Sequence, residues 1–243
     1  MDTHRIDNPN QTPVTQLAKT RRHLRFRGGT RRLTPASKTL APVKLNVDAA
    51  GAVLAPIFND LPATKAAGQH NLTYGEVEWP TLKFMVEYID KATPPSLQNR
   101  GRFYDLGSGR GRAVLYMGLA GPFEQSVGIE VLPERLSLAQ QALAKLKHSI
   151  PSAGSKIRLY EATFLNSAFK YRDARAVYLS NLAFDVEVQE AIFRKLAAEM
   201  PKGSLLFCHK APAVIPGAFE VLAVERLPTT WTPTSDFHIL RHL

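Results

Sequence analysis

From residue 102 to the C-terminus, short apolar runs alternate with longer segments in which apolar residues recur every three or four positions. The short runs predict strands, and the longer segments predict helices with one buried face. The predicted strands span residues 103–106, 126–130, 157–160, 176–179, 204–208, 219–226 and 237–240. The predicted helices span residues 112–120, 133–148 and 186–200. Strands and helices therefore alternate until the last two strands, which follow each other directly.

This alternation favours an α/β fold. Strands separated by helices are typical of a mostly parallel sheet that is covered on both faces. The last two predicted strands have no helix between them and are expected to form an antiparallel C-terminal edge. We therefore predict a mostly parallel, seven-stranded sheet of the Rossmann-like type.

The residues before 102 divide into two parts by composition. No acidic residue lies between Asp7 and Asp48, whereas nine lysines and arginines fall there among glycines and prolines. Such a segment is too polar to form a core, so we expect residues 1–50 to be a flexible basic arm. Residues 51–98 are expected to be mainly helical, because apolar residues between 79 and 89 fall on one side of a helix. The remaining residues, 99–243, form the predicted α/β domain.

The basic arm has two interpretations. It is either a solvated tail without a partner or a segment that binds nucleic-acid phosphates, a contact that gains affinity by releasing counterions. The formal net charge of +10 is consistent with a polyanionic partner. The candidate phosphate-binding residues are Arg21, Arg22, Arg25, Arg27, Arg31 and Arg32. A mitochondrial targeting peptide is disfavoured, because Asp2 and Asp7 lie near the start.

Composition also limits the class of protein and its compartment. The single cysteine, Cys208, excludes an intrachain disulfide and a cysteine-based metal site. No stretch approaches the roughly 18 uncharged apolar residues needed to cross a bilayer. We therefore expect a protein of the cytosol or nucleus, with no metal site and no membrane partner.

A glycine-rich run joins the first predicted strand to the first predicted helix of the α/β domain. Gly107, Gly109 and Gly111 would let the backbone approach a ligand, with Ser108 and the start of the helix facing it. Glu130 ends the next strand, about 20 residues after the run, where an acid suits the hydroxyls of a ribose. These features predict a nucleoside cofactor, although glycines also serve tight turns between a strand and a helix.

Asp105 distinguishes between two such cofactors. A carboxylate just before the glycines would repel the pyrophosphate of a dinucleotide but attract the ammonium and sulfonium groups of S-adenosylmethionine. The acid therefore favours this methyl donor over a nicotinamide dinucleotide. The alternative role for Asp105 is to cap the helix that follows the glycines.

The ends of two further strands are expected to complete the cofactor pocket. After the third strand, Phe164 is a candidate to lie on the adenine ring and Thr163 to hydrogen-bond its edge. Core packing is the alternative role for Phe164. After the fourth strand, Ser180 and Asn181 are candidates to bind the methionine part or an acceptor amine. They could equally cap the helix that follows.

Four pieces of the sequence, taken together, are far more specific than the glycine run. These pieces are Thr73-Tyr74-Gly75-Glu76, residues 105–111 with Gly128-Ile129-Glu130, Asn181-Leu182-Ala183-Phe184, and Lys210 with Trp231-Thr232. In this order and spacing, the chain from Leu72 onward resembles the disruptor-of-telomeric-silencing family of histone H3 lysine methyltransferases. The resemblance implies a class I methyltransferase fold, S-adenosylmethionine as cofactor, and a nuclear enzyme that methylates the globular region of histone H3 on nucleosomes.

The resemblance also assigns roles to individual residues. Tyr74 and Glu76 would fold over the methionine part of the cofactor, in the segment before residue 98. Phe184 and Trp231 would line the channel for the acceptor lysine. The candidate catalytic set is therefore Tyr74, Ser180, Asn181, Phe184 and Trp231.

Several positions depart from the usual residues of this family. They are Arg112 for glutamine, Thr163 for an acid, Ser180 for the first of two asparagines, and Cys208-His209 for two serines. Arg112 remains a candidate cofactor contact, and the differences indicate a partly remodelled pocket. The last aromatic residue of the lysine channel is either Phe237 or His238.

Two alternatives to a histone methyltransferase stay open. An RNA methyltransferase would use the basic arm to hold its substrate, but enzymes that methylate bases often carry an Asn/Asp-Pro-Pro-aromatic motif after the fourth strand. Residues 180–184 lack the prolines of that motif. The other alternative is a nucleic-acid-binding module with a decayed cofactor pocket.

Overall fold

The computed structural model describes residues 43–64, 75–93, 100–213 and 215–243. Most of the predicted arm, including its six candidate arginines, lies outside these residues, and so does Tyr74. The first helix, α1, spans Val47–Asn59 and therefore begins before the expected arm boundary at residue 50. Asn46 caps this helix, since its side chain accepts a hydrogen bond of 2.8 Å from the Ala49 amide.

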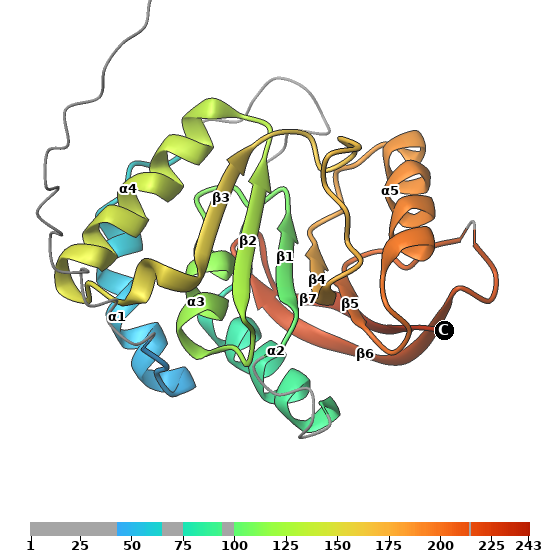
Figure 1. The fold of residues 1–243 in the computed structure, drawn as a ribbon, viewed down its shortest axis with the longest axis horizontal. Helices are drawn as coiled ribbons and strands as arrows, with labels where there is room; N and C mark the ends of the chain where they lie inside the picture. The colour runs from blue at the N-terminus through green and yellow to red at the C-terminus, as the bar shows by residue number, and fades with distance from the viewer. Residues whose placement is uncertain (1–42, 65–74, 94–99, 214) are drawn as a thin grey trace, which may run out of the picture. The chain divides into compact units, whose positions relative to one another are not determined.

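Within the described residues, seven strands form one sheet (Figure 1). They are β1 Arg102–Leu106, β2 Gln125–Glu130, β3 Ile157–Glu161, β4 Ala174–Leu179, β5 Leu205–Cys208, β6 Phe219–Thr229 and β7 Thr232–His242. Their order is β3-β2-β1-β4-β5-β7-β6. Strands β1 to β5 are parallel, and β7 is antiparallel to both β5 and β6. The predicted mostly parallel sheet with an antiparallel C-terminal edge is confirmed.

The last two strands are longer than predicted. The apolar pattern indicated residues 219–226 and 237–240, whereas β6 and β7 pair as one hairpin from Phe219 with His242 to Thr229 with Thr232. Residues 227–236 contain two prolines and several threonines and show little apolar alternation. The pairing of the hairpin supports these residues, and the two that are buried, Thr229 and Ser235, are polar, so the apolar pattern does not indicate their strand conformation.

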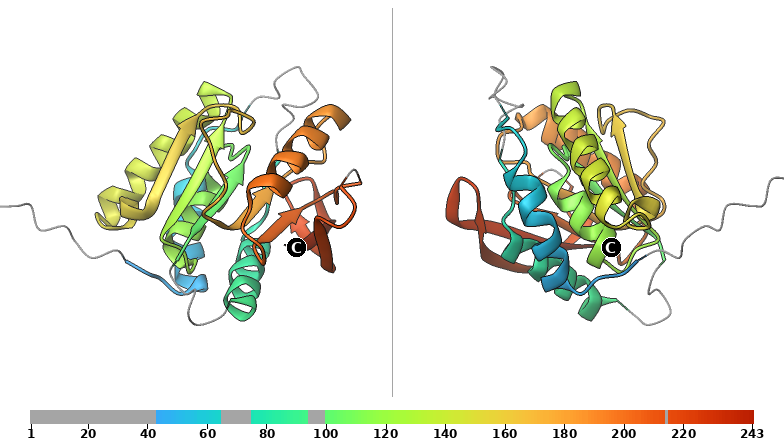
Figure 2. Two further views of the ribbon diagram at one scale, coloured as in Figure 1. Left: turned by 45° about the vertical axis from the view of Figure 1, so that its right-hand side comes forward. Right: turned by 90° about the vertical axis from the view of Figure 1, so that its left-hand side faces the viewer.

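Helices cover both faces of the sheet (Figure 2). They are α2 Trp79–Ala92, α3 Arg112–Ala120, α4 Pro133–Ser149 and α5 Val186–Glu199, with a short 3-10 helix, η3, at Ala153–Lys156. None of the described helices is long and apolar enough to cross a membrane. α1, α2 and α3 share one apolar core with Phe103 and Phe207, while α5 shares a second core with Tyr104 and Leu206. Neighbouring residues of one strand thus point to opposite cores, as expected for a sheet buried on both faces.

The strand order determines where a ligand can enter. The chain runs outward from β1 through β2 to β3 and then returns to build β4 on the other side of β1. Open α/β sheets bind ligands at such a switch point, at the carboxyl ends of the strands. Asp105 of β1 and Tyr178 of β4 are paired in register at this place. The fold therefore puts the predicted acid at the position where a cofactor is expected.

Candidate active site

The glycine-rich turn between β1 and α3 has a left-handed backbone. Gly107, Gly109 and Gly111 have φ angles of 89°, 53° and 82°, a region that favours glycine. The amides of Gly107 and Ser108 donate hydrogen bonds to the Ile129 carbonyl at 2.9 and 3.1 Å. The turn is thereby fixed to β2, and α3 begins directly beside the end of β1.

A cavity lies at this turn, with a volume of about 310 Å³ including space open to solvent. Its walls come from segment 75–77, the end of β1, the glycine turn with the start of α3, and the end of β4. Its lining residues are Gly75, Glu76, Val77, Asp105, Gly107, Ser108, Gly109, Arg112, Ala113, Tyr178 and Ser180. The structure thus brings seven of the predicted site residues together and adds Tyr178, which no sequence motif indicated.

Two buried carboxylates, Glu76 and Asp105, line the cavity, and a third, Glu130, lies behind Gly109 of its wall. Glu76, Asp105 and Glu130 are only 8%, 4% and 3% exposed. Burial raises the pKa of Asp105 well above its usual value, and the charges of Glu130 and Glu76 raise it further. None of the described residues donates a hydrogen bond to the Asp105 carboxylate, so nothing among them offsets these effects. A cationic ligand would relieve the repulsion between the carboxylates.

Glu130 holds the glycine turn from the end of β2. One oxygen of its carboxylate accepts a hydrogen bond from the Gly109 amide at 2.8 Å, and the other accepts from the Leu132 amide at 2.9 Å. Bonds to a charged acceptor are short and hold the carboxylate in one orientation. Each carboxylate oxygen has more than one acceptor site, so Glu130 can still accept hydrogen bonds from ligand hydroxyls.

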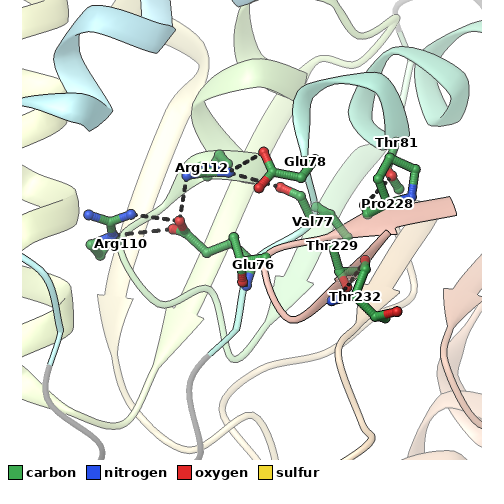
Figure 3. A network of polar contacts seen from close by, with 10 residues as sticks. Glu76, Val77, Glu78, Thr81, Arg110, Arg112, Pro228, Thr229 and Thr232 are labelled. Carbon is green, nitrogen blue, oxygen red and sulfur yellow. Dashed lines mark hydrogen bonds and ion pairs between the residues drawn. The ribbon is translucent and has the colours of Figure 1, made fainter. Parts of the chain in front are cut away.

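Glu76 forms the centre of an ion-pair network beside the cavity (Figure 3). Its Oε2 atom lies 2.7 Å from a guanidinium nitrogen of Arg110 and 2.8 Å from one of Arg112. Arg112 also pairs with Glu78 at 3.3 Å. Sequence reasoning selected Glu76 and Arg112 but missed Arg110, because the partner of Arg110 lies 34 residues earlier in the chain.

The β6–β7 hairpin holds segment 75–78 in place. The Glu76 amide donates a hydrogen bond to the Thr230 hydroxyl at 3.0 Å, and the Thr230 amide donates to the Glu76 carbonyl at 2.9 Å. The Glu78 amide donates to the Pro228 carbonyl at 3.2 Å. One wall of the cavity therefore depends on the last two strands of the sheet.

Two of the predicted aromatic residues lie together near the glycine turn. The rings of Phe164 and Phe184 pack with their centroids 5.5 Å apart. A Cβ atom built on Gly107 would lie 3.7 Å from the Phe184 ring. Phe184 was assigned to the lysine channel by resemblance, but the structure places it beside Phe164 and the turn.

Two serine side chains lie at the cavity, and the Ser180 side chain hydrogen-bonds Tyr178. Ser180 lines the cavity, and the buried Ser108 hydroxyl has no hydrogen-bond partner among the described residues. The predicted Thr163 is different, because it is exposed and its hydroxyl accepts a hydrogen bond from the Leu165 amide at 3.3 Å. Thr163 thus supports the local turn after β3.

A second and larger space, a groove, adjoins the cavity at Trp231. Its volume is about 980 Å³ including space open to solvent, and it is lined by Leu182, His209, Lys210, Arg226, Trp231, Thr232, Thr234, Ser235 and Asp236. Trp231 is 41% exposed, and its ring covers Gly75 so closely that a Cβ atom on Gly75 would overlap it. Gly75 also lines the cavity. The Trp231 ring therefore lies between the cavity and the groove.

His209, which sequence reasoning did not select, lies between the groove and Tyr178 of the cavity. It is 3% exposed, and its ring packs edge-on against Trp231 with 5.4 Å between centroids. Its Nδ1 atom lies 3.1 Å from the Asp236 carbonyl, and its Nε2 atom lies 3.4 Å from the Tyr178 hydroxyl. A carbonyl only accepts hydrogen bonds, so we assign the proton to Nδ1 and let Nε2 accept from Tyr178. Burial lowers the pKa of His209 to about 4, so the ring is neutral near pH 7.

Neither Phe237 nor His238, the two candidates for the last aromatic residue of the lysine channel, lines the groove. Phe237 is fully buried, and its ring packs against His209 at 5.3 Å between centroids. In this part of β7 the described lining of the groove consists of Ser235 and Asp236. Phe237 therefore supports the wall from behind, and His238 lies outside the lining.

Asn181 joins the ends of β4 and β5. Its Oδ1 atom accepts hydrogen bonds from the His209 and Lys210 amides, each at 3.0 Å. Its Nδ2 atom donates to the Gln189 side chain at 3.0 Å and to the Lys210 carbonyl at 2.9 Å. All four hydrogen-bonding positions are therefore used within the protein, and we assign Asn181 a positioning role instead of a ligand contact. It does not cap α5 either, because the N-cap residue of that helix is Asp185.

A family model described as histone methylation protein DOT1 matches residues 57–213. The chain belongs to this family. No curated protein matches it. Among solved structures, an RNA methyltransferase from Salinibacter ruber in complex with S-adenosyl-L-homocysteine is 19% identical, with a TM-score of 0.47 over 67% of this chain and 90% of that chain. Magnesium protoporphyrin IX methyltransferase from Synechocystis with bound S-adenosylmethionine is 13% identical, with a TM-score of 0.49 over 68% of this chain and 79% of that chain.

Methyl transfer by DOT1 proteins uses S-adenosylmethionine, which is the cofactor of this chain. The cavity fits this cation, because its carboxylates repel one another and raise the pKa of Asp105. The buried Ser108 hydroxyl, which has no partner among the described residues, is available for a hydrogen bond to the cofactor. The alternative role of Asp105 as a helix cap does not hold, since the N-cap of α3 is Gly111 and no side chain caps it.

The neutral His209 is expected to make the stability of this DOT1 protein depend on pH. Its folded pKa of about 4 lies below the unfolded value of about 6.5, so the unfolded state binds more protons between these values. The free energy of unfolding should therefore fall by up to about 3 kcal/mol as the pH drops through this range. Chemical denaturation at a series of pH values measures the slope, and His209→Gln should make it shallower. Equal slopes would show that the ring takes up its proton in the folded protein.

Proposed function

We propose that this protein is a nuclear histone-lysine methyltransferase, which transfers a methyl group from S-adenosylmethionine to a lysine in the globular region of histone H3 on nucleosomes. The observation that carries the proposal is the position of the Trp231 ring, which lies between an open groove and the cavity that fits the cationic donor. An open groove suits a lysine presented on the surface of a folded particle. Membership of the DOT1 family supports a histone as the acceptor.

The residues around the cavity are proposed to hold the donor. Asp105 would offer its carboxylate to the positive charge, and Glu130 would accept hydrogen bonds from the ribose hydroxyls. Phe164 would lie on the adenine ring. S-adenosylmethionine, when bound, supplies an activated methyl group on its sulfonium. Segment 75–78 closes one side of the cavity, and Tyr74, directly before it, is proposed to cover the methionine part.

The Trp231 ring is proposed to guide the lysine side chain from the groove to the cavity. A lysine amine with an ordinary pKa of about 10.4 is protonated at neutral pH and must lose its proton before it can attack. Trp231 and the neutral His209 form an uncharged wall beside the path of the amine. Contact with this wall removes water from the amine, and this desolvation lowers the pKa of the lysine. The proton can leave through the open groove, so the proposal requires no dedicated general base.

The basic arm is proposed to hold the enzyme on nucleosomal DNA. The arginines concerned are Arg21, Arg22, Arg25, Arg27, Arg31 and Arg32, which lie outside the described residues. The support comes from their composition, because clustered arginines bind DNA phosphates and release counterions. A tether of this kind raises the local concentration of a histone lysine at the groove without any new contact to the histone.

The acceptor is tested by offering S-adenosylmethionine with a labelled methyl group together with whole nucleosomes, free histones or RNA. We expect label on histone H3 of nucleosomes, within its globular region, and much less label on free histone. Mass spectrometry of the reacted nucleosomes identifies the modified residue. Label on RNA alone, or only on a disordered histone tail, would contradict the proposed acceptor and leave the donor site standing.

The same assay tests the arm with two matched variants. Replacing the six arginines of the arm by alanine should reduce methylation of nucleosomes but not of free histone. The control variant removes six exposed positive charges from the α/β domain and its preceding helix, at Lys91, Lys147, Arg158, Arg172, Arg194 and Lys202. It carries the same net charge as the first variant and should retain its activity on nucleosomes. Equal losses of nucleosome methylation in both variants would mean that the net charge of the protein, and not the arm, holds the enzyme on the nucleosome.

A further inference from the structure

Glu76, Arg110 and Arg112 form an almost buried cluster of charges at the cavity, called here the arginine clasp (Figure 3). Their side chains are 7%, 11% and 11% exposed. One oxygen of Glu76 lies within 2.8 Å of both guanidinium groups. Charges in such surroundings are costly unless a partner compensates them. Glu76 thus contacts both guanidinium groups at one point of the cavity wall, and Glu78 is a second carboxylate partner of Arg112.

Other contacts hold both guanidinium groups independently of Glu76. Arg110 donates a hydrogen bond to the Pro62 carbonyl at 3.3 Å. Arg112 pairs with Glu78 at 3.3 Å, and its guanidinium carbon lies 4.9 Å from the centroid of the Trp79 ring. A guanidinium group over an aromatic face is attracted by the ring. Both positive charges would therefore stay in place if Glu76 lost its charge.

We propose that the arginine clasp makes the cavity select the charged methyl donor over its neutral product, S-adenosylhomocysteine. The inference rests on the proposed assignment of the cavity as the donor site. Glu76 and Arg112 line this cavity together with Asp105. While Glu76 is ionised, it offsets the guanidinium charges, and the carboxylate of Asp105 attracts the sulfonium. Without the charge of Glu76, Glu78 alone faces two guanidinium groups, and the excess positive charge opposes a cation at the same position.

The donor and the product separate this electrostatic role from a structural one. They differ at sulfur by one methyl group and one positive charge. A charged wall acts strongly on a sulfonium in a cavity of low dielectric and only weakly on a neutral thioether. A purely structural role of the clasp, such as holding segment 75–78, would change the affinity for both ligands alike. The ratio of the two dissociation constants therefore reports the electrostatic role.

Calorimetric titration of the full chain with both ligands tests the inference. In Glu76→Gln, affinity for S-adenosylmethionine is expected to fall by at least about tenfold and affinity for S-adenosylhomocysteine by about threefold or less. Arg112→Gln removes one positive charge and should shift the ratio in the opposite direction, by about threefold or more in favour of the donor. Glu87→Gln makes the same change as the first variant at an exposed position of α2 and should leave the ratio unchanged.

The possible outcomes distinguish the clasp from the donor site. Equal losses for both ligands in Glu76→Gln, with no shift of the ratio in Arg112→Gln, would overturn the role of the clasp and leave the donor site standing. If thermal unfolding shows that Glu76→Gln does not fold, the ratio measured in Arg112→Gln decides alone. Wild-type protein that binds neither ligand would overturn both the clasp and the proposed donor site.

Discussion

Asp105→Asn is expected to weaken binding of S-adenosylmethionine by at least about tenfold, because it removes a charged contact of about 1.5–3 kcal/mol. The same change should leave the unliganded protein at least as stable as before at neutral pH. Burial and the neighbouring acids raise the pKa of Asp105, so the folded state holds its proton more tightly than the unfolded state. The free energy of unfolding therefore falls as the pH rises above the unfolded pKa of about 3.9. Asparagine does not ionise, so the variant does not lose this stability.

The raised pKa of Asp105 also predicts how cofactor binding depends on pH. A bound cation favours the ionised carboxylate. Binding therefore releases a proton at each pH at which the Asp105 carboxyl of the free protein is still protonated. Affinity in the wild-type protein should therefore rise with pH, and in Asp105→Asn it should not. Calorimetric titration at several pH values and chemical denaturation measure the two effects. Asp90→Asn, at an exposed position of α2, is the control. Unchanged affinity in Asp105→Asn would remove this residue from the donor site.

The cavity could be predicted because its central residues are neighbours in the sequence. Asp105 and the glycines occupy one run between a strand and a helix, and the alternating pattern places that run at the carboxyl end of the strand. Glu130 ends the next strand, and the parallel register pairs Asp105 with Gly128. Local patterns and the rules of parallel sheets are therefore sufficient for this half of the site.

The walls of the cavity could not be predicted, because they depend on contacts between distant parts of the chain. Arg110 meets Glu76 from 34 residues away, and His209 meets Tyr178 from 31 residues away. No local pattern identifies either partner. Asn181 is an opposite case, in which a pattern predicted a ligand contact that the protein itself occupies. A polar residue at the end of a strand is a typical ligand contact, yet the side-chain amide of Asn181 binds the backbone directly after β5. A pattern predicts where a polar group lies but not which groups satisfy it.

Trp231→Ala is expected to lower kcat for methyl transfer by at least about tenfold while the dissociation constant of S-adenosylmethionine stays within about threefold. The Trp231 ring packs against His209 and covers Gly75, between the cavity and the groove. Removing the ring leaves the carboxylates of Asp105 and Glu130 in place, so the donor is still held. The acceptor amine loses the surface that orients it, and a small misplacement of a reacting group costs much of the rate.

Gly75→Ala displaces the same ring from the other side, because a Cβ atom at this position would overlap Trp231. Single-turnover rates should therefore fall in this variant too. The double variant with Trp231→Ala should be no slower than Trp231→Ala alone, since both changes act through one ring. Phe219→Ala, at the far end of the same hairpin, should leave the rate unchanged. Additive losses in the double variant, or donor affinity that falls in step with the rate, would place Trp231 in the donor site and not on the path of the acceptor.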